Sequence, residues 1–220
     1  MTVLILASTS PRRRELIQLL GLPYEIATAD VDESSVTHPD PAVNVVETAR
    51  LKANAVAAQT TRRDVIIIAA DTTVAIDGEM SGKPADAAAA RQMLRRLRGR
   101  VHQVHTGIVL AHMGTGEVAA DVASVDVPMR AYTEAEIEAY VASGDPLDKA
   151  GAYAIQHPNF APVAHLADCY AAVVGLPLCH LARALRWLGV HPTADVPSCC
   201  QQHHGYNCPV YEKILGIAAP

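Results

Sequence analysis

A phosphate site is indicated by residues 8–15, whose sequence STSPRRRE joins anion-binding side chains to the start of a helix. The segment follows a short apolar run over residues 3–7 and precedes leucines and an isoleucine at helical spacing. Ser10 suits the N-cap and Pro11 the first helical position, so free amides and the positive end of the helix dipole point outward beside the arginines. Phosphate binds readily at such a helix start, and a capped helix with a solvated basic turn is the alternative.

A carboxylate and two lysines supply further chemistry. Residues 65–70 form a continuous, mostly β-branched run, typical of a strand buried on both faces, and the run ends directly at Asp71. Because ligands bind at the carboxyl ends of strands in open α/β sheets, Asp71 is a candidate metal ligand or base, with a turn cap as the alternative. Lys83 lies in a Gly-flanked bend after a hairpin predicted over residues 74–80, whereas Lys52 lies within a predicted helix and by itself indicates nothing.

The elements that must position these side chains alternate between strands and helices. Strands are predicted over residues 3–7, 23–28, 65–70, 101–112, 117–132 and 170–174. Helices are predicted from residue 11 and over residues 42–59, 85–97, 134–142 and 178–188. Alternating valines in the fifth strand favour antiparallel pairing, and residues 147–156, which lack a clean period, suit a loop folded onto a ligand.

Composition and charge exclude several classes of protein. The chain of 220 residues is 50% apolar and carries a formal charge of −5, which argues against nucleic acid as its partner. We find no apolar run of about 20 residues and no pattern of a signal peptide, so we expect a cytoplasmic protein without a membrane partner. Five cysteines, an odd number gathered in the C-terminal quarter, suggest reduced thiols and no disulfide framework.

The tail over residues 191–220 differs in composition from the rest of the chain. It contains several prolines and a cluster of possible zinc ligands, namely Cys199, Cys200, His203, His204 and Cys208. The cluster lacks a second zinc-knuckle spacing, so a loosely ordered extension is the alternative to a zinc site. We expect removal of the tail to leave catalysis near normal.

Several motifs, taken in order, resemble the Maf family of nucleoside triphosphate pyrophosphatases. They are LASTSPRRREL, AADTTVAIDGEMSGKP, LRGRVHQVHTG, YVASGDPLDKAGAYAIQ and VVGLPL, and they span about residues 3–188. The resemblance implies an α/β fold related to that of inosine triphosphatase, with a mixed, strongly bent central sheet flanked by helices and a cleft at the carboxyl ends of the strands. It divides the chain into a Maf-like domain over residues 1–190 and an extension of unknown role over residues 191–220.

The same resemblance implies an activity and an assembly. A cytoplasmic homodimer would hydrolyse a nucleoside triphosphate to the monophosphate and pyrophosphate. The family is also linked to nucleotide-pool cleaning and to restraint of septum formation. A non-catalytic nucleotide sensor of cell division is the alternative. The presence of both Asp71 and the lysines favours the enzyme, because a sensor needs cations to bind phosphate but no base.

The resemblance also implies a role for each residue of this chain that matches a motif of the family. Ser8, Ser10, Arg12, Arg13, Lys52 and Lys83 would bind the substrate, Asp71 would accept a proton, and Glu33 with Asp71 would hold a divalent cation, Mg²⁺ or Mn²⁺. The family divides into a dTTP/UTP branch and a 7-methyl-GTP branch, and the residues that separate them fall at Arg12, Thr72 and Gln156. This chain has the dTTP/UTP set, with the 7-methyl-GTP branch as the alternative. An amide such as that of Gln156 can match the O4 and N3–H edge of uracil or thymine.

Overall fold

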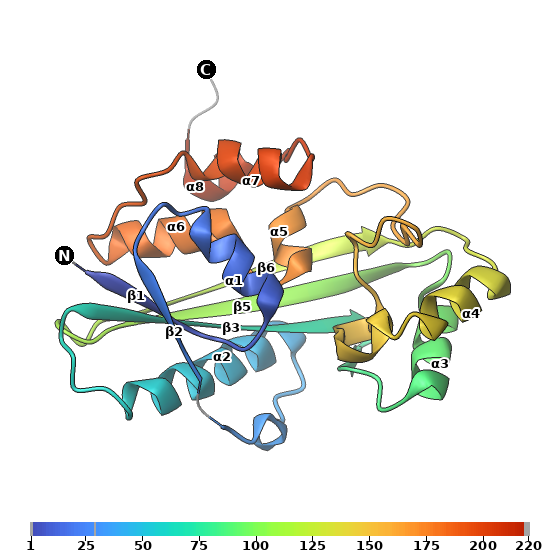
Figure 1. Ribbon diagram of the computed structural model, residues 1–220, viewed down its shortest axis with the longest axis horizontal. Coiled ribbons are helices and arrows are strands. Elements are labelled where there is room, and N and C mark those ends of the chain that lie inside the picture. The colour runs from blue at the N-terminus through green and yellow to red at the C-terminus, as the bar shows by residue number, and fades with distance from the viewer. Residues whose placement is uncertain (1, 29, 218–220) are drawn as a thin grey trace.

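The computed structural model describes residues 2–28 and 30–217, and a mixed sheet of six strands forms its centre (Figure 1). The strand order is β2-β1-β3-β5-β6, and β4 also pairs with β3. The strands are β1 (Val3–Ala7), β2 (Tyr24–Ala27), β3 (Val65–Ile76), β4 (Glu79–Ser81), β5 (Val101–His112) and β6 (Val118–Pro128). β1 pairs in parallel with β2 and β3. The pairs β3–β4, β3–β5 and β5–β6 are antiparallel. The predicted mixed α/β sheet flanked by helices is confirmed.

Helices cover both faces of this sheet. They are α1 (Pro11–Gln18), α2 (Pro41–Ala57), α3 (Ala87–Leu97), α4 (Glu134–Ala142), α5 (Tyr170–Val174), α6 (Leu178–Trp187), α7 (Val196–His204) and α8 (Tyr211–Leu215). Figure 1 shows α2 on one face and α1, α5 and α6 on the other, with α7 and α8 lying over α6. Short 3₁₀ turns cover residues Glu33–Ser35, Asp145–Asp148 and Ala150–Ala152.

β3 contributes to the cores on both faces of the sheet. Ile66 and Ile68 pack with the leucines of α1 and α6, whereas Val65 and Ile67 pack with the small residues on α2. Successive side chains of a strand point to opposite faces, so an uninterrupted apolar run is what two covering layers require. The predicted strand buried on both faces is therefore confirmed.

The end of β3 differs from the prediction. The strand does not stop at Asp71 but continues to Ile76, and Asp71 pairs with Gly107 in the middle of the ladder between β3 and β5. The apolar run marks only the part of the strand with a helix layer over each face. Beyond it, the polar residues Asp71 and Thr72 occupy strand positions that are partly open to solvent.

A second correction concerns residues 170–174, which form α5 and not a strand. A short apolar run fits a buried helix as well as a buried strand, and periodicity does not separate them. Gly175, in the left-handed conformation, ends the helix and donates its N–H to the carbonyl of Ala171. The helix predicted over residues 134–142, in contrast, is present, and a capping box formed by Thr133 and Glu136 begins it.

The tail is neither of the two predicted alternatives. Residues 196–204 and 211–215 form α7 and α8, which pack against α6, and Val196 is buried in the main core. The carbonyl of Leu20 accepts the backbone N–H of Thr193, and the carbonyls of Leu166 and Asp168 share the hydroxyl hydrogen of Tyr206. The tail residues that the structure describes include no group of three or more potential metal ligands. The tail is an ordered layer, and its zinc site is not supported.

All five thiols are free, as the cysteine count predicts. Burial raises the pKa of Cys179 and Cys200 to about 12, so both are thiols at neutral pH. Among residues 2–28 and 30–217, we find no helix long and apolar enough to cross a membrane.

Candidate active site

A cleft of about 1160 Å³ opens beside the middle of β3. All the site residues predicted from the sequence line it, namely Ser8, Ser10, Arg12, Arg13, Glu33, Lys52, Asp71, Thr72, Lys83 and Gln156. The pairing of β3 explains its position. On one edge β1 pairs with residues 65–68 and β4 with residues 74–76, which leaves residues 69–73 without a strand partner on that edge among the described residues. Side chains from both faces of β3 therefore reach the cleft.

The start of α1 forms one wall. Ser10 is the N-cap and its hydroxyl accepts the N–H of Arg13, while the Ser8 hydroxyl accepts the N–H of Ser10. Pro11 occupies the first helical turn as predicted. The loop after β1 is thus held by its own serines, and the positive end of α1 lies beside Arg12 and Arg13.

Arg13 is fixed by polar contacts with other elements. Its Nε donates to the carbonyl of Gly175 at 2.8 Å, and its Nη2 donates to Oγ1 of Thr72 at 3.0 Å. Burial lowers the pKa of this guanidinium, the carboxylate of Asp71 opposes that shift, and the charge of Arg12 adds to it. A partly buried cation so placed favours an anionic ligand in the cleft.

Lys52 lies between two carboxylates on the opposite wall. Its Nζ is 2.7 Å from Oδ1 of Asp71 and 2.9 Å from Oε2 of Glu33. The side chains of Lys52 and Asp71 are 15% and 16% exposed, whereas that of Glu33 is 55% exposed. An isolated lysine at mid-helix carried no sequence signal, and the structure supplies its context.

The close approach of α2 to the sheet explains this geometry. Gly107 on β5, the cross-strand neighbour of Asp71, faces the backbone of Val45 and Val46, and a Cβ there would lie 2.7 Å from it. Only glycine permits this distance. Lys52 follows two turns after Val45 on the same side of α2, so the contact at Gly107 sets how far its ammonium reaches.

The donor set fits a hard divalent cation. Glu33 and Asp71 supply carboxylate oxygens on either side of one ammonium nitrogen, and Mg²⁺ in nucleotide sites is commonly held by one or two carboxylates together with substrate phosphates. The described residues contain no group of three or more metal ligands, so a complete protein cage is absent from that part of the chain. The arrangement therefore suits a cation that arrives with a phosphate ligand.

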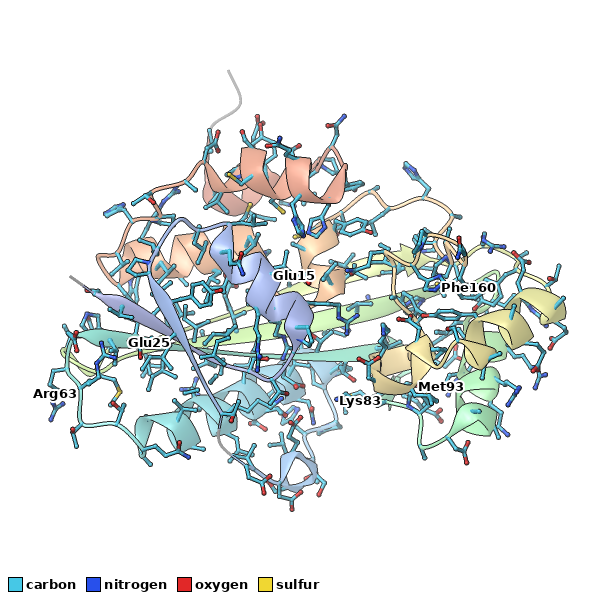
Figure 2. The ribbon with its side chains drawn as sticks, viewed as in Figure 1. Glu15, Glu25, Arg63, Lys83, Met93 and Phe160 are labelled. Carbon is cyan, nitrogen blue, oxygen red and sulfur yellow. The ribbon has the colours of Figure 1, made fainter. Side chains whose placement is uncertain are left out.

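The remaining predicted residues lie on two loops. Lys83 is exposed on the loop that leads to α3, near the sheet end where α3 and α4 lie (Figure 2). Gln156 follows the 3₁₀ turns, and the N–H of Gly151 donates to the carbonyl of Gly82, which joins the two loops. The predicted loop folded onto a ligand does line the cleft.

Lys149 is a residue of the cleft that sequence reasoning did not single out. It is 7% exposed, and its Nζ donates to the carbonyl oxygen and a carboxylate oxygen of Asp145 and to the carboxylate of Asp148. Asp145 also accepts the hydroxyl of Tyr140, whose oxygen accepts the N–H of Ala154. These bonds hold the loop that carries Gln156. The sequence feature that could have found it is the pair of neighbouring charges at Asp148 and Lys149 inside a mostly apolar loop.

Cationic side chains, a helix start and two carboxylates around one open cleft define a protein that binds a polyanion. The chain belongs to the Maf family, since it matches the family described as Maf-like protein over residues 3–188. It is 46% identical over 190 residues to a dTTP/UTP pyrophosphatase of Moorella thermoacetica, covering 86% of this chain and 97% of that relative. A relative of the same name from Salinibacter ruber is 46% identical over 185 residues, covering 83% of this chain and 89% of its own.

A third dTTP/UTP pyrophosphatase, from Bacillus cytotoxicus, is 41% identical over 182 residues, covering 83% of this chain and 93% of its own. Among solved structures, a HAM1 protein from Coxiella burnetii covers 59% of this chain and 73% of its own at 21% identity and a TM-score of 0.44. That likeness covers only part of either chain. The family membership of this chain rests on the Maf match and on the curated relatives.

Proposed function

We propose that this protein hydrolyses dTTP and UTP to the monophosphate and pyrophosphate. The observation that carries the proposal is the convergence of cations from separate elements on one carboxylate. Arg12 and Arg13 come from α1, Lys52 from α2 and Lys83 from a distant loop, and all four line the cleft that contains Asp71. Such a cluster accepts a triphosphate in a chain whose net charge is −5.

Asp71 is the proposed general base. Its carboxylate is oriented by the ammonium of Lys52 and faces the cleft, where it can accept a proton from a water molecule that attacks the α-phosphorus. The bond between the α-phosphorus and the bridging oxygen then breaks, and pyrophosphate leaves. Mg²⁺ or Mn²⁺ held by Glu33 and Asp71 would neutralise part of the phosphate charge when bound.

The cations have complementary roles in this scheme. The start of α1, with Ser8, Ser10 and Arg12, binds phosphate oxygens through fixed donors, and such preorganised donors stabilise charge that develops in the transition state. Lys83 is exposed on a loop, so it can meet the departing pyrophosphate from the open side of the cleft. Arg13, with two of its nitrogens already bonded to protein, contributes mainly fixed charge.

Base choice is assigned to Arg12, Thr72 and Gln156. The proposal of dTTP and UTP is supported by the relatives of that name and by the amide of Gln156, which offers both a donor and an acceptor to the edge of uracil or thymine. Adenine has neither a carbonyl nor a ring N–H on this edge, so it would leave polar groups of the site unmatched, which costs affinity. Assembly as a cytoplasmic homodimer is proposed from the family resemblance, and light scattering of the purified chain tests the dimer.

Hydrolysis of UTP in ¹⁸O-labelled water tests the reaction. Attack at the α-phosphorus puts the label in UMP and releases unlabelled pyrophosphate, which mass spectrometry resolves. Label in pyrophosphate or in inorganic phosphate would contradict the proposed bond cleavage. Tight binding of UTP without any turnover, at saturating Mg²⁺ or Mn²⁺, would favour the non-catalytic sensor.

A further inference from the structure

Thr106 on β5 is a buried polar residue behind the candidate active site. It is 0% exposed, pairs across the ladder with Thr72 and does not line the cleft. Its Oγ1 lies 2.9 Å from Oγ1 of Thr72 and donates to the carbonyl of Ala172 at 2.8 Å. The residue therefore acts on the site only through Thr72 and α5.

The hydrogens in this chain of bonds have a single consistent arrangement. A carbonyl oxygen only accepts, so the hydroxyl hydrogen of Thr106 is used at Ala172. Thr106 must then accept at its contact with Thr72, which makes Thr72 the donor there. At its other contact Thr72 accepts, because the guanidinium of Arg13 has donors only.

The consequence concerns what Thr72 can offer a ligand. Its hydroxyl hydrogen is directed into the protein, and one lone pair is used by Arg13, so its oxygen presents one remaining acceptor site. Thr72 lies in the cleft and is partly exposed. A group on the ligand that carries a hydrogen is matched there, whereas a group that carries a lone pair meets an oxygen that has no hydrogen to give.

We propose that Thr106 is a positioning residue that fixes Thr72 as a hydrogen-bond acceptor and thereby favours nucleobases with a ring N–H. The inference rests on the proposed function. The bases of dTTP and UTP share an N3–H, whereas cytosine has a lone pair at N3. The sugar 3′-hydroxyl and the triphosphate are common to all these nucleotides, so they do not distinguish UTP from CTP. Thr106 therefore contributes to the choice of uracil and thymine over cytosine without touching them.

The experiment compares pyrophosphate release from UTP and CTP. Wild type is expected to show a higher kcat/KM for UTP, and Thr106→Val, which keeps the shape but frees the hydroxyl hydrogen of Thr72, is expected to lower the UTP/CTP ratio about 5- to 20-fold. Most of the change is expected in KM. Thr106→Ser is the matched control, because it keeps the hydroxyl and should keep the wild-type ratio.

A second variant keeps the test decisive if Thr106→Val does not fold. Thr72→Val removes the acceptor itself and should lower the UTP/CTP ratio at least as much, and in the double variant the two effects should not add. An unchanged ratio in Thr72→Val, or in folded Thr106→Val, would overturn the proposal. If wild type releases no pyrophosphate, the proposed function fails, and calorimetric binding of α,β-imido UTP and CTP still measures the ratio.

Discussion

The ammonium of Lys52 lies 2.7 Å from Oδ1 of Asp71, and the two side chains are each about five-sixths buried at the side of the cleft. Glu33 binds the same ammonium from the solvent side. One cation thus compensates two carboxylates, and the loop that carries Glu33 is held against α2. The charge of Lys52 is therefore required to bring both acidic groups to one place.

Replacing Lys52 by methionine tests this relationship. Without the ammonium the two carboxylates repel each other and Asp71 loses its orienting partner, so kcat/KM for UTP should fall roughly 10²-fold. Lys213→Met removes the same charge from an exposed position of α8 outside the cleft and serves as the control. A wild-type kcat/KM for Lys52→Met would show that this ion pair plays no part in catalysis.

Gly107→Ala tests the contact that sets the position of α2. The added Cβ would lie 2.7 Å from backbone atoms of Val45 and Val46, so α2 must shift. We expect a loss of stability of about 1–3 kcal/mol, as for overpacking, and a lower kcat/KM because Lys52 moves with the helix. In Gly116→Ala no atom of the described residues lies within 4 Å of the new Cβ, so only backbone strain should appear and activity should remain. Equal activity of the two variants would argue against the contact at Gly107.

Acid should destabilise the protein through His102. This histidine is 2% exposed, its Nε2 bonds with the hydroxyl of Tyr153, and burial lowers its pKa to about 4. Its folded pKa lies below the unfolded value of about 6.5, so the unfolded state binds the proton first and unfolding becomes easier as pH falls from about 6.5 to about 4. Denaturant unfolding of His102→Gln should show a smaller loss of stability over that window. An identical pH dependence would exclude His102 as the cause.

The tail should contribute to stability more than to catalysis. Deleting residues 191–220 removes the buried Val196 and the hydrogen bonds to the carbonyl of Leu20, so the melting temperature should fall. The kcat measured well below the melting temperature should stay near that of wild type, because residues 191–217 do not line the cleft. Tyr206→Phe removes the one hydroxyl hydrogen that the carbonyls of Leu166 and Asp168 share and should cost about 1–2 kcal/mol. An unchanged melting temperature on truncation would mean that the packing of α7 and α8 contributes little.

Local sequence patterns were enough to predict the start of the site. Ser10 and Pro11 predict the start of α1, and the apolar run before Asp71 predicts β3. Both predictions work because helix capping and burial on both faces of a sheet determine residue types within a few positions of the chain. The contact between Lys52 and Asp71 on the other wall of the cleft could not be predicted from local patterns. Lys52 and Asp71 are brought together by long-range packing of α2 on β5, which depends on a glycine that has no pattern of its own.

The errors have equally specific causes. The run at residues 170–174 is too short for periodicity to separate a helix from a strand. Thr106 lies in a strand that contains several other polar residues, so its type alone does not mark it, and its proposed role follows only from the partners of its hydroxyl. Cysteine and histidine density in the tail suggested a metal, but four of these residues lie along α7 and Cys208 follows it, and the described residues contain no group of three or more that could hold a metal ion.

The most direct measurement is the rate of pyrophosphate release from UTP by Asp71→Asn. The amide keeps the shape of the side chain and can still hydrogen-bond, but it cannot accept a proton or balance the charge of Lys52. We expect kcat to fall roughly 10²–10⁴-fold, since base catalysis and charge are lost together, with a melting temperature close to that of wild type. Asp126→Asn, an exposed residue of β6 outside the cleft, should keep the wild-type kcat. Full activity of Asp71→Asn at a normal melting temperature would contradict the mechanism.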